Sequence, residues 1–143
     1  MGILDVLFGD RTKGLPPLSP DSEAAQRLEA ERRPLESLVE EVNEPVEVVP
    51  SDAVLYAFIG RPPKRFGLAW IRDGRVGNFK TLVEERHVAP TRLERLVDQL
   101  RDAYQRSDGA PRYRTTVAGN TVVVTVSGDL GREVHELVDQ VAA

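Results

Sequence analysis

Phe66-Gly-Leu-Ala-Trp-Ile-Arg72, the dipeptide Asp73-Gly74 and then Arg75-Val-Gly-Asn-Phe-Lys-Thr-Leu82 together predict a β-hairpin. Asp-Gly suits a two-residue turn in which both residues adopt positive φ. Strand alternation places Phe66, Trp70 and Arg72 on one face. Trp70 is the only tryptophan of the 143-residue chain. The hairpin therefore joins a large aromatic side chain to a basic segment.

Further strands are predicted on both sides of this hairpin. Residues 45–50 (PVEVVP) are bounded by proline, which favours an edge strand. Residues 53–60 (AVLYAFIG) are apolar at nearly every position, which is typical of a central strand. A second hairpin is predicted to join 112–117 to 121–126 through a Gly119-Asn120 turn. The sequence thus predicts six strands.

Apolar residues at helical spacing predict helices between and after these strands. Ser19 is the expected N-cap of a first helix, which Pro34 should split near Arg32. Thr81 is predicted to start a short helical turn, and Pro90 the clearest helix of the chain. The last helix is expected to be capped by Ser127 or Asp129. The predicted class is α+β: a two-layer sandwich with a mostly antiparallel sheet of about six strands and helices on one face.

The N-terminal residues 1–18 are predicted to form a flexible segment beside a single domain over 19–143. Ile3, Leu4, Leu7 and Phe8 would share one side of a short helix, and the Gly- and Pro-rich stretch that follows is typical of a linker. A helix of two turns is marginal alone in water, so this apolar face should lie on its own domain or in a partner's groove. A membrane surface is the least favoured support, because the segment is short and lacks a basic flank.

The composition excludes several classes of protein. The chain has no cysteine, which excludes a disulfide scaffold, a thiolate metal site and a cysteine nucleophile. No apolar run approaches the roughly 18 residues that a membrane span needs, and the N-terminus lacks the basic region of a signal peptide. A cytoplasmic location is therefore expected.

Charge is divided unevenly along the chain, although the net charge is only −4. Residues 21–52 hold ten acids and three bases, whereas residues 53–80 hold six bases and one acid. The acidic helices could pack beside the basic hairpin within one molecule; alternatively, the basic face is a docking surface. The six bases are Arg61, Lys64, Arg65, Arg72, Arg75 and Lys80.

No catalytic or cofactor-binding motif occurs in the sequence. The two histidines, His87 and His135, are expected at the surface, and neither has the partners that a metal site requires. No serine occupies a nucleophile elbow, and no glycine-rich phosphate loop is present. The sequence therefore predicts no enzyme, no metal and no cofactor, although a site assembled from distant residues stays open.

The leading hypothesis is a non-enzymatic interaction or regulatory adaptor module with a protein partner. The expected contact residues are the six bases, Trp70 and the four apolar N-terminal side chains. Self-association is a variant, because the acidic helix of one copy could meet the basic hairpin of another. The alternative is a single-stranded nucleic-acid-binding domain, in which aromatic and basic residues of the 61–80 hairpin would hold bases and phosphates. Burial of Trp70 beneath helices would remove its stacking role.

Overall fold

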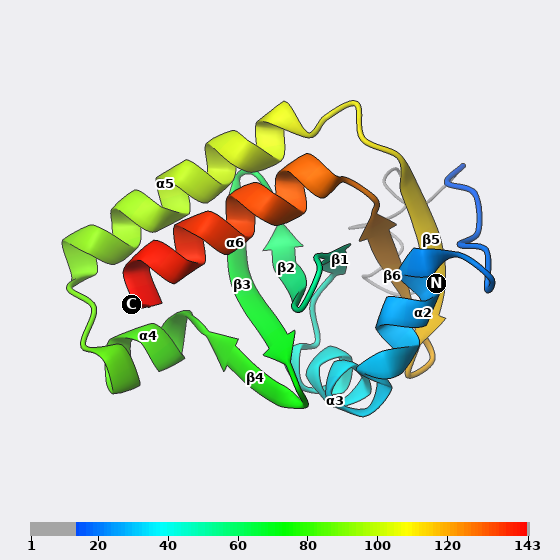
Figure 1. Ribbon diagram of the computed structural model, residues 1–143, viewed down its shortest axis with the longest axis horizontal. Helices are drawn as coiled ribbons and strands as arrows, with labels where there is room; N and C mark the ends of the chain where they lie inside the picture. The colour runs from blue at the N-terminus through cyan, green and yellow to red at the C-terminus, as the bar shows by residue number, and fades with distance from the viewer. Residues whose placement is uncertain (1–13, 143) are drawn as a thin grey trace.

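The computed structural model describes residues 14–142, which form one six-stranded sheet with helices packed against it (Figure 1). The helices are α2 (Glu23–Ala30), α3 (Arg32–Val42), α4 (Phe79–Arg86), α5 (Pro90–Arg106) and α6 (Gly128–Ala142). The strands are β1 (Val46–Pro50), β2 (Leu55–Arg61), β3 (Arg65–Arg72), β4 (Arg75–Asn78), β5 (Arg112–Val117) and β6 (Asn120–Thr125).

The strand order is β4-β3-β2-β1-β6-β5. All neighbours are antiparallel except β1 and β6, which pair in parallel with Val48 opposite Val124. The predicted class, α+β with a mostly antiparallel six-stranded sheet, is confirmed. The parallel pair was not predicted, because it joins two segments that are far apart in the sequence.

Helices cover both faces of the sheet, where the sequence predicted one. On one face, Tyr56 and Phe58 of β2 pack with side chains of α4, α5 and α6. On the other, Leu55 and Ala57 of the same strand pack against α2 and α3. A strand that is apolar at consecutive positions needs cover on both sides, because neighbouring side chains point to opposite faces. The larger helical layer matches the prediction, and α2 and α3 form a second one.

Several element boundaries differ from the predicted ones for local reasons. The first helix is capped by Ser22, whose hydroxyl accepts a hydrogen bond from the Ala25 N–H at 3.1 Å, and not by Ser19. The predicted split is confirmed: α2 ends before Glu31, and Pro34 lies in the first turn of α3, where its missing N–H costs nothing. The turn of the second hairpin uses Ala118 and Gly119, both with positive φ, one residue earlier than expected.

The hairpin of β3 and β4 is also shorter than predicted. Phe79 begins α4, whose N-cap Asn78 forms a capping box with Thr81. Asn78 Oδ1 accepts from the Thr81 N–H at 3.0 Å, and Thr81 Oγ1 accepts from the Asn78 N–H at 3.2 Å. The residues from Phe79 to Leu82 are therefore helical. Their apolar side chains, including the fully buried Leu82, pack onto the sheet as part of α4.

A proline-rich segment runs along β5, an edge strand of the sheet. Arg114 donates its N–H to the Pro16 carbonyl at 3.0 Å and accepts from the Leu18 N–H at 2.8 Å, and Pro17 forms the bridge. Residues 16, 17 and 20 are prolines without N–H groups, which limits how far the pairing can continue. Covering an edge in this way hinders pairing with other chains. The predicted N-terminal helix lies outside the described residues.

None of the helices within residues 14–142 combines the length and the apolarity that crossing a bilayer requires.

Candidate functional site

The structure divides the predicted basic surface between the two ends of β3. Arg61 and Arg65 face each other in the β2–β3 register and, with the exposed Lys64, form a basic turn. Arg72 and Arg75 face each other at the Asp73-Gly74 turn. Arg65 and Arg72 are the first and last residues of β3, so seven residue steps of extended strand separate them, about 23 Å. Five of the predicted cations thus form one trio and one separate pair, and not one patch.

Arg101 of α5 fixes the basic turn, the name used below for Arg61–Arg65. Its Nε donates to the Pro63 carbonyl at 2.7 Å, and its NH1 to Asp98 Oδ1, also at 2.7 Å. Its guanidinium carbon lies 5.8 Å from the centroid of the Phe66 ring, a cation–π distance. The turn therefore has a fixed position against α5.

The cations of the basic turn have no described ion-pair partner. Within residues 14–142, none of Arg61, Lys64 and Arg65 forms an ion pair, and the same holds for Arg72 and Arg75. At the Asp73-Gly74 turn, the Gly74 N–H donates to the Glu31 side chain, with Oε2 at 3.1 Å, so this acid is bonded to backbone and not to a cation of the hairpin. Packing of acidic helices beside the hairpin thus leaves these charges unneutralised.

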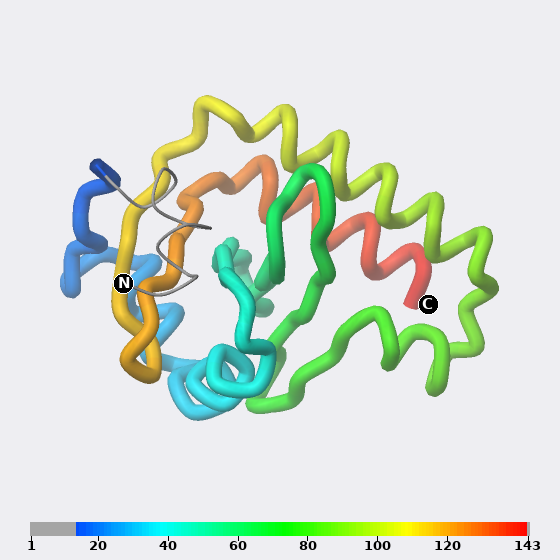
Figure 2. Tube along the Cα trace, turned by 180° about the vertical axis from the view of Figure 1, so that it is seen from behind, coloured from blue at the N-terminus to red at the C-terminus, as the bar shows by residue number. Residues whose placement is uncertain are grey.

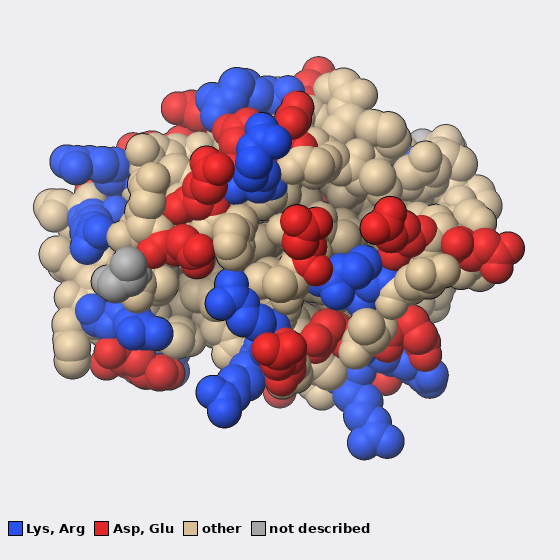
Figure 3. Space-filling model, viewed as in Figure 1, with Lys and Arg blue, Asp and Glu red and all other residues tan. Residues whose placement is uncertain are grey.

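Lys80 belongs to α4 and not to the hairpin. Its Nζ lies 3.8 Å from Glu84 Oε1 on the next helical turn, with both side chains largely exposed. Exposed ion pairs of this kind contribute little to the stability of the fold. Across the face seen in Figure 3, cations and anions are interspersed and no large area of one sign forms.

Trp70 is half-buried and packs against the apolar cluster that lies between the sheet and the helices α4, α5 and α6. Its indole lies over Gly77 of β4: a Cβ added there would be 2.1 Å from Trp70 Nε1. Tyr56 and Phe58 are buried, with 1% and 0% exposure, while Phe66 and Phe79 are half-buried in the same cluster. The aromatic residues of the predicted surface therefore belong mainly to the core. Ile3, Leu4, Leu7 and Phe8 lie outside the described residues.

A hydrogen-bonded chain that the sequence did not predict links Tyr56, His135 and Asp139. The Tyr56 hydroxyl lies 2.8 Å from His135 Nδ1, and His135 Nε2 lies 3.1 Å from Asp139 Oδ2. A neutral imidazole with its proton on Nε2 satisfies both contacts. Burial raises the pKa of Tyr56 well above its ordinary value; the Asp139 carboxylate adds to this and Arg72 opposes it.

His135 lies near the surface, as predicted, but its ring is engaged with the core residue Tyr56 and not simply solvated. Its side chain is 35% exposed, and the ring lies against the sheet. Tyr56 and His135 are 79 positions apart, so no local pattern links them. Two signals were available: a tyrosine in an otherwise apolar strand needs a partner for its hydroxyl, and His135 and Asp139 have i,i+4 spacing. Both ring nitrogens of His135 thus have a partner within the protein.

A depression of about 580 Å³ lies where the carboxyl ends of the parallel strands β1 and β6 meet the start of α6. Arg27 reaches it from α2 and donates to the Ser51 carbonyl through Nε at 3.1 Å and NH2 at 2.8 Å. Ser127 caps α6 by accepting from the Leu130 N–H at 3.1 Å, as predicted. Arg27 and Ser127 thus make hydrogen bonds to the protein backbone. His135 also lines this depression.

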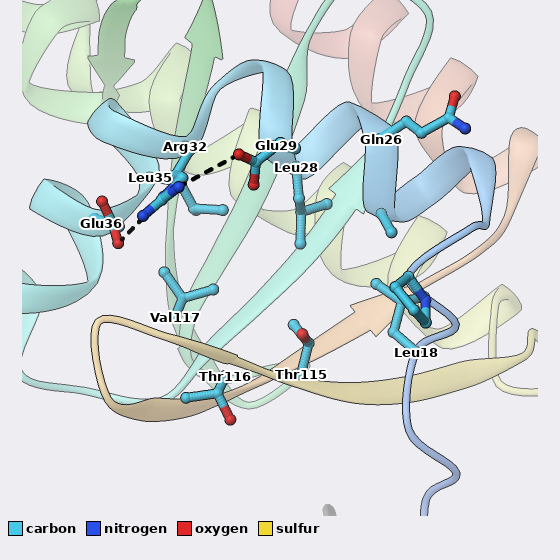
Figure 4. A pocket seen from close by; sticks show the side chains of 12 residues that line it. Leu18, Gln26, Leu28, Glu29, Arg32, Leu35, Glu36, Thr115, Thr116 and Val117 are labelled. Carbon is cyan, nitrogen blue, oxygen red and sulfur yellow. Dashed lines mark hydrogen bonds and ion pairs between the residues drawn. The ribbon is translucent and has the colours of Figure 1, made fainter.

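A smaller groove of about 400 Å³ separates α2 and α3 from β5 (Figure 4). Its floor is apolar, and on its rim Arg32 lies between Glu29 at 3.4 Å and Glu36 at 3.7 Å. Leu28 and Leu35 in the floor are only 7% and 2% exposed. A ligand in this groove would remove little further apolar surface from water.

A buried polar network fixes β1 against β5, β6 and α5. Glu47 Oε1 accepts from the Tyr104 hydroxyl at 2.7 Å, and Oε2 accepts from Thr125 Oγ1 at 2.5 Å and from Arg112 Nε at 3.1 Å. Arg112 NH2 also donates to Ser107 Oγ at 3.0 Å. Glu47 is 2% exposed, and such a carboxylate needs several donors. This network is a structural feature of the core.

Metal binding has no evident place in the described structure. In residues 14–142 no group of three or more histidine, aspartate or glutamate side chains is arranged to hold an ion. Comparison of the chain with models of protein families, with curated proteins and with solved structures found no match.

Proposed function

We propose that this protein is a non-enzymatic interaction module, an adaptor or regulator in the cytoplasm, that binds a protein partner through its basic turn. The observation that carries the proposal is the fixed turn Arg61–Arg65, whose three cations have no ion-pair partner among residues 14–142. The cytoplasmic location rests on the absence of cysteine.

The position of the turn favours binding. A surface that is already ordered loses less conformational entropy when a partner docks than a mobile one does. Arg101 supplies this order by holding the Pro63 carbonyl and lying over Phe66. Uncompensated positive charge also accelerates encounter with an acidic surface and makes binding depend on salt. An acidic protein surface is therefore the partner chemistry that the turn fits.

The Tyr56–His135–Asp139 chain gives less support to an enzyme. Catalytic groups must reach the substrate, and Tyr56, the hydroxyl that His135 contacts, is only 1% exposed. Binding of single strands by stacking also has less support, because Tyr56 and Phe58 are buried and Trp70 is half-buried.

Affinity capture with three forms of the full chain tests the proposal. The first is the wild type and the second carries Arg61→Gln, Lys64→Gln and Arg65→Gln. The third is a matched control, Arg72→Gln with Arg75→Gln, which removes exposed cations at the opposite end of β3. Capture is performed at about 50 and 500 mM salt, with and without nuclease.

We expect a protein partner that is retained by the wild type and by the control at low salt, and lost from the neutralised turn. Equal recovery by all three forms would overturn the proposal. Loss of the partner on nuclease treatment would also overturn it, in favour of a nucleic-acid ligand.

A further inference from the structure

Three chain segments meet at one end of the sheet. Because β1 and β6 are parallel and their other neighbours are antiparallel, the β2–β3 turn, the β5–β6 turn and the end of α3 lie at the same end. The Gly60 N–H donates to the Pro45 carbonyl at 2.9 Å, which places the third residue beyond α3 next to the start of the basic turn. Figure 2 shows the chain leaving α3 and entering the sheet beside the β2–β3 hairpin.

The end of α3 carries three exposed acids, Glu40, Glu41 and Glu44, here called the acidic trio. None of them forms an ion pair within the described part of the chain. Glu40 and Glu41 lie in the last turn of a helix, where the macrodipole disfavours negative charge. Glu40 and Glu44 also line a small depression with Asn120 and Thr121 of the β5–β6 hairpin. A cation from outside the molecule would offset the repulsion between these carboxylates and the negative end of the helix dipole.

The basic turn lies at the same end of the sheet as the acidic trio. Strand alternation directs the side chains of Arg61 and Arg65 to the same face as Ile59, which is the face that α2 and α3 cover. Three apolar side chains that are only half-buried occupy this end as well: Val42, Ile59 and Ala118. The end of the sheet thus combines three acids, three bases and an apolar centre.

We propose that the partner of the basic turn is a second copy of this chain, in a symmetric dimer formed end to end. A two-fold axis between the acidic trio and the basic turn brings the acids of each copy onto the bases of the other and closes the assembly at two copies. The half-buried apolar side chains meet at the axis. This inference rests on the proposed function and names the occupant of the same surface.

Charge complementarity favours a second copy over an unrelated partner. An isologous interface needs a patch that is complementary to itself, and equal numbers of acids and bases side by side meet that condition. The contacts are exposed ion pairs around a small apolar centre, so the dimer is weak and salt-dependent. Each copy has a mass of 15.9 kDa, and association is therefore visible by light scattering.

Charge reversal on the purified full chain tests the dimer. The acid-reversed form carries Glu40→Lys, Glu41→Lys and Glu44→Lys; the base-reversed form carries Arg61→Glu, Lys64→Glu and Arg65→Glu. A matched control reverses the same number of exposed bases elsewhere, Arg33→Glu, Arg86→Glu and Arg95→Glu. Trp70 emission and circular dichroism confirm that each form is folded. Masses are measured at about 1 mM protein in about 20 and 500 mM salt.

We expect the wild type to dimerise in low salt, with the dimer fraction reduced at least about fivefold in high salt. Each reversed form should be monomeric alone, and their mixture should form a heterodimer. The matched control keeps the acidic trio and the basic turn, so it should dimerise with itself like the wild type. Mixed with the acid-reversed form it should not give the heterodimer that the base-reversed form gives, although the net charges of the two mixtures are the same.

Two results would overturn the inference. A wild type that stays monomeric in low salt excludes the second copy as the partner. A dimer unaffected by either reversal uses another surface. In both cases the affinity capture with the neutralised turn still decides separately whether the basic turn binds a different acidic protein.

Discussion

The Tyr56 hydroxyl lies 2.8 Å from Nδ1 of His135, so the central strand β2 is joined to α6 by a polar contact within an apolar layer. A buried hydroxyl without a partner is costly, and His135 supplies that partner. The contact also fixes the rotation of α6 relative to the sheet, because His135 must face Tyr56 while Val134 and Val138 stay in the core.

Stability should fall at high pH because of Tyr56. Its raised pKa means that the folded protein holds the phenolic proton more tightly than the unfolded chain does. The contribution of the protonated Tyr56 to the free energy of unfolding is fully present below about pH 10. Above pH 10 it decreases, by about 1.4 kcal/mol per pH unit at most. Urea unfolding of wild type and Tyr56→Phe from pH 8 to 11.5 measures this. The difference between the two should shrink above pH 10; a constant difference would contradict the prediction.

Replacement of Gly77 by alanine should displace the indole of Trp70. The new Cβ would lie 2.1 Å from Nε1, so we expect a loss of about 1–3 kcal/mol and a shift of the tryptophan emission to longer wavelength. Gly67→Ala is the matched control, because a Cβ at Gly67 of the adjacent strand meets nothing within 4 Å. Equal effects of the two substitutions would show that the contact with Trp70 is unimportant.

Glu47→Gln should be strongly destabilising. It leaves Arg112, whose side chain is 17% exposed, without its counter-charge, and removing one member of such a pair costs about 3 kcal/mol. Glu29→Gln, which breaks an exposed pair with Arg32, should cost less than about 0.5 kcal/mol. Chemical denaturation measures both. A loss below about 1 kcal/mol for Glu47→Gln would mean that the network adds little to stability.

Arg101→Gln should loosen the basic turn without unfolding the domain. Loss of the donor to the Pro63 carbonyl removes a charged hydrogen bond, equivalent to about tenfold faster local opening. Amide hydrogen exchange at Arg61, Lys64 and Phe66 reports this opening. Arg95→Gln, an exposed position on the same helix, is the control. Unchanged exchange at the turn would show that Arg101 does not hold it.

Local patterns in the sequence predicted the elements well and their long-range contacts poorly. Alternation and turn residues identified all six strands, and Pro34 correctly divided the first helical region. The second helical layer could have been inferred from β2, whose Leu55 and Tyr56 are both buried. The partner of His135 could not, since nothing near His135 in the sequence specifies Tyr56.

The predicted basic surface is a second case in which local features were predicted and their arrangement in space was not. The exposed cations can be identified from the sequence, but their closeness along the chain was taken to mean that they form one surface patch. Extended geometry places Arg65 and Arg72 at opposite ends of a strand, and helix capping by Asn78 moves Lys80 into α4. Which bases act together depends on topology, which short-range patterns do not encode.

The pairing of Leu15–Leu18 with Arg114 has a practical consequence for shortening the chain. A form that starts at Ser19 would lack the segment that covers β5, so the backbone N–H and C=O groups of this edge strand would be unpaired. Such an edge pairs with other copies of the chain, and this aggregation would resemble binding of a partner. A form that starts at Gly14 keeps that cover, and deletion studies of the first thirteen residues should begin there.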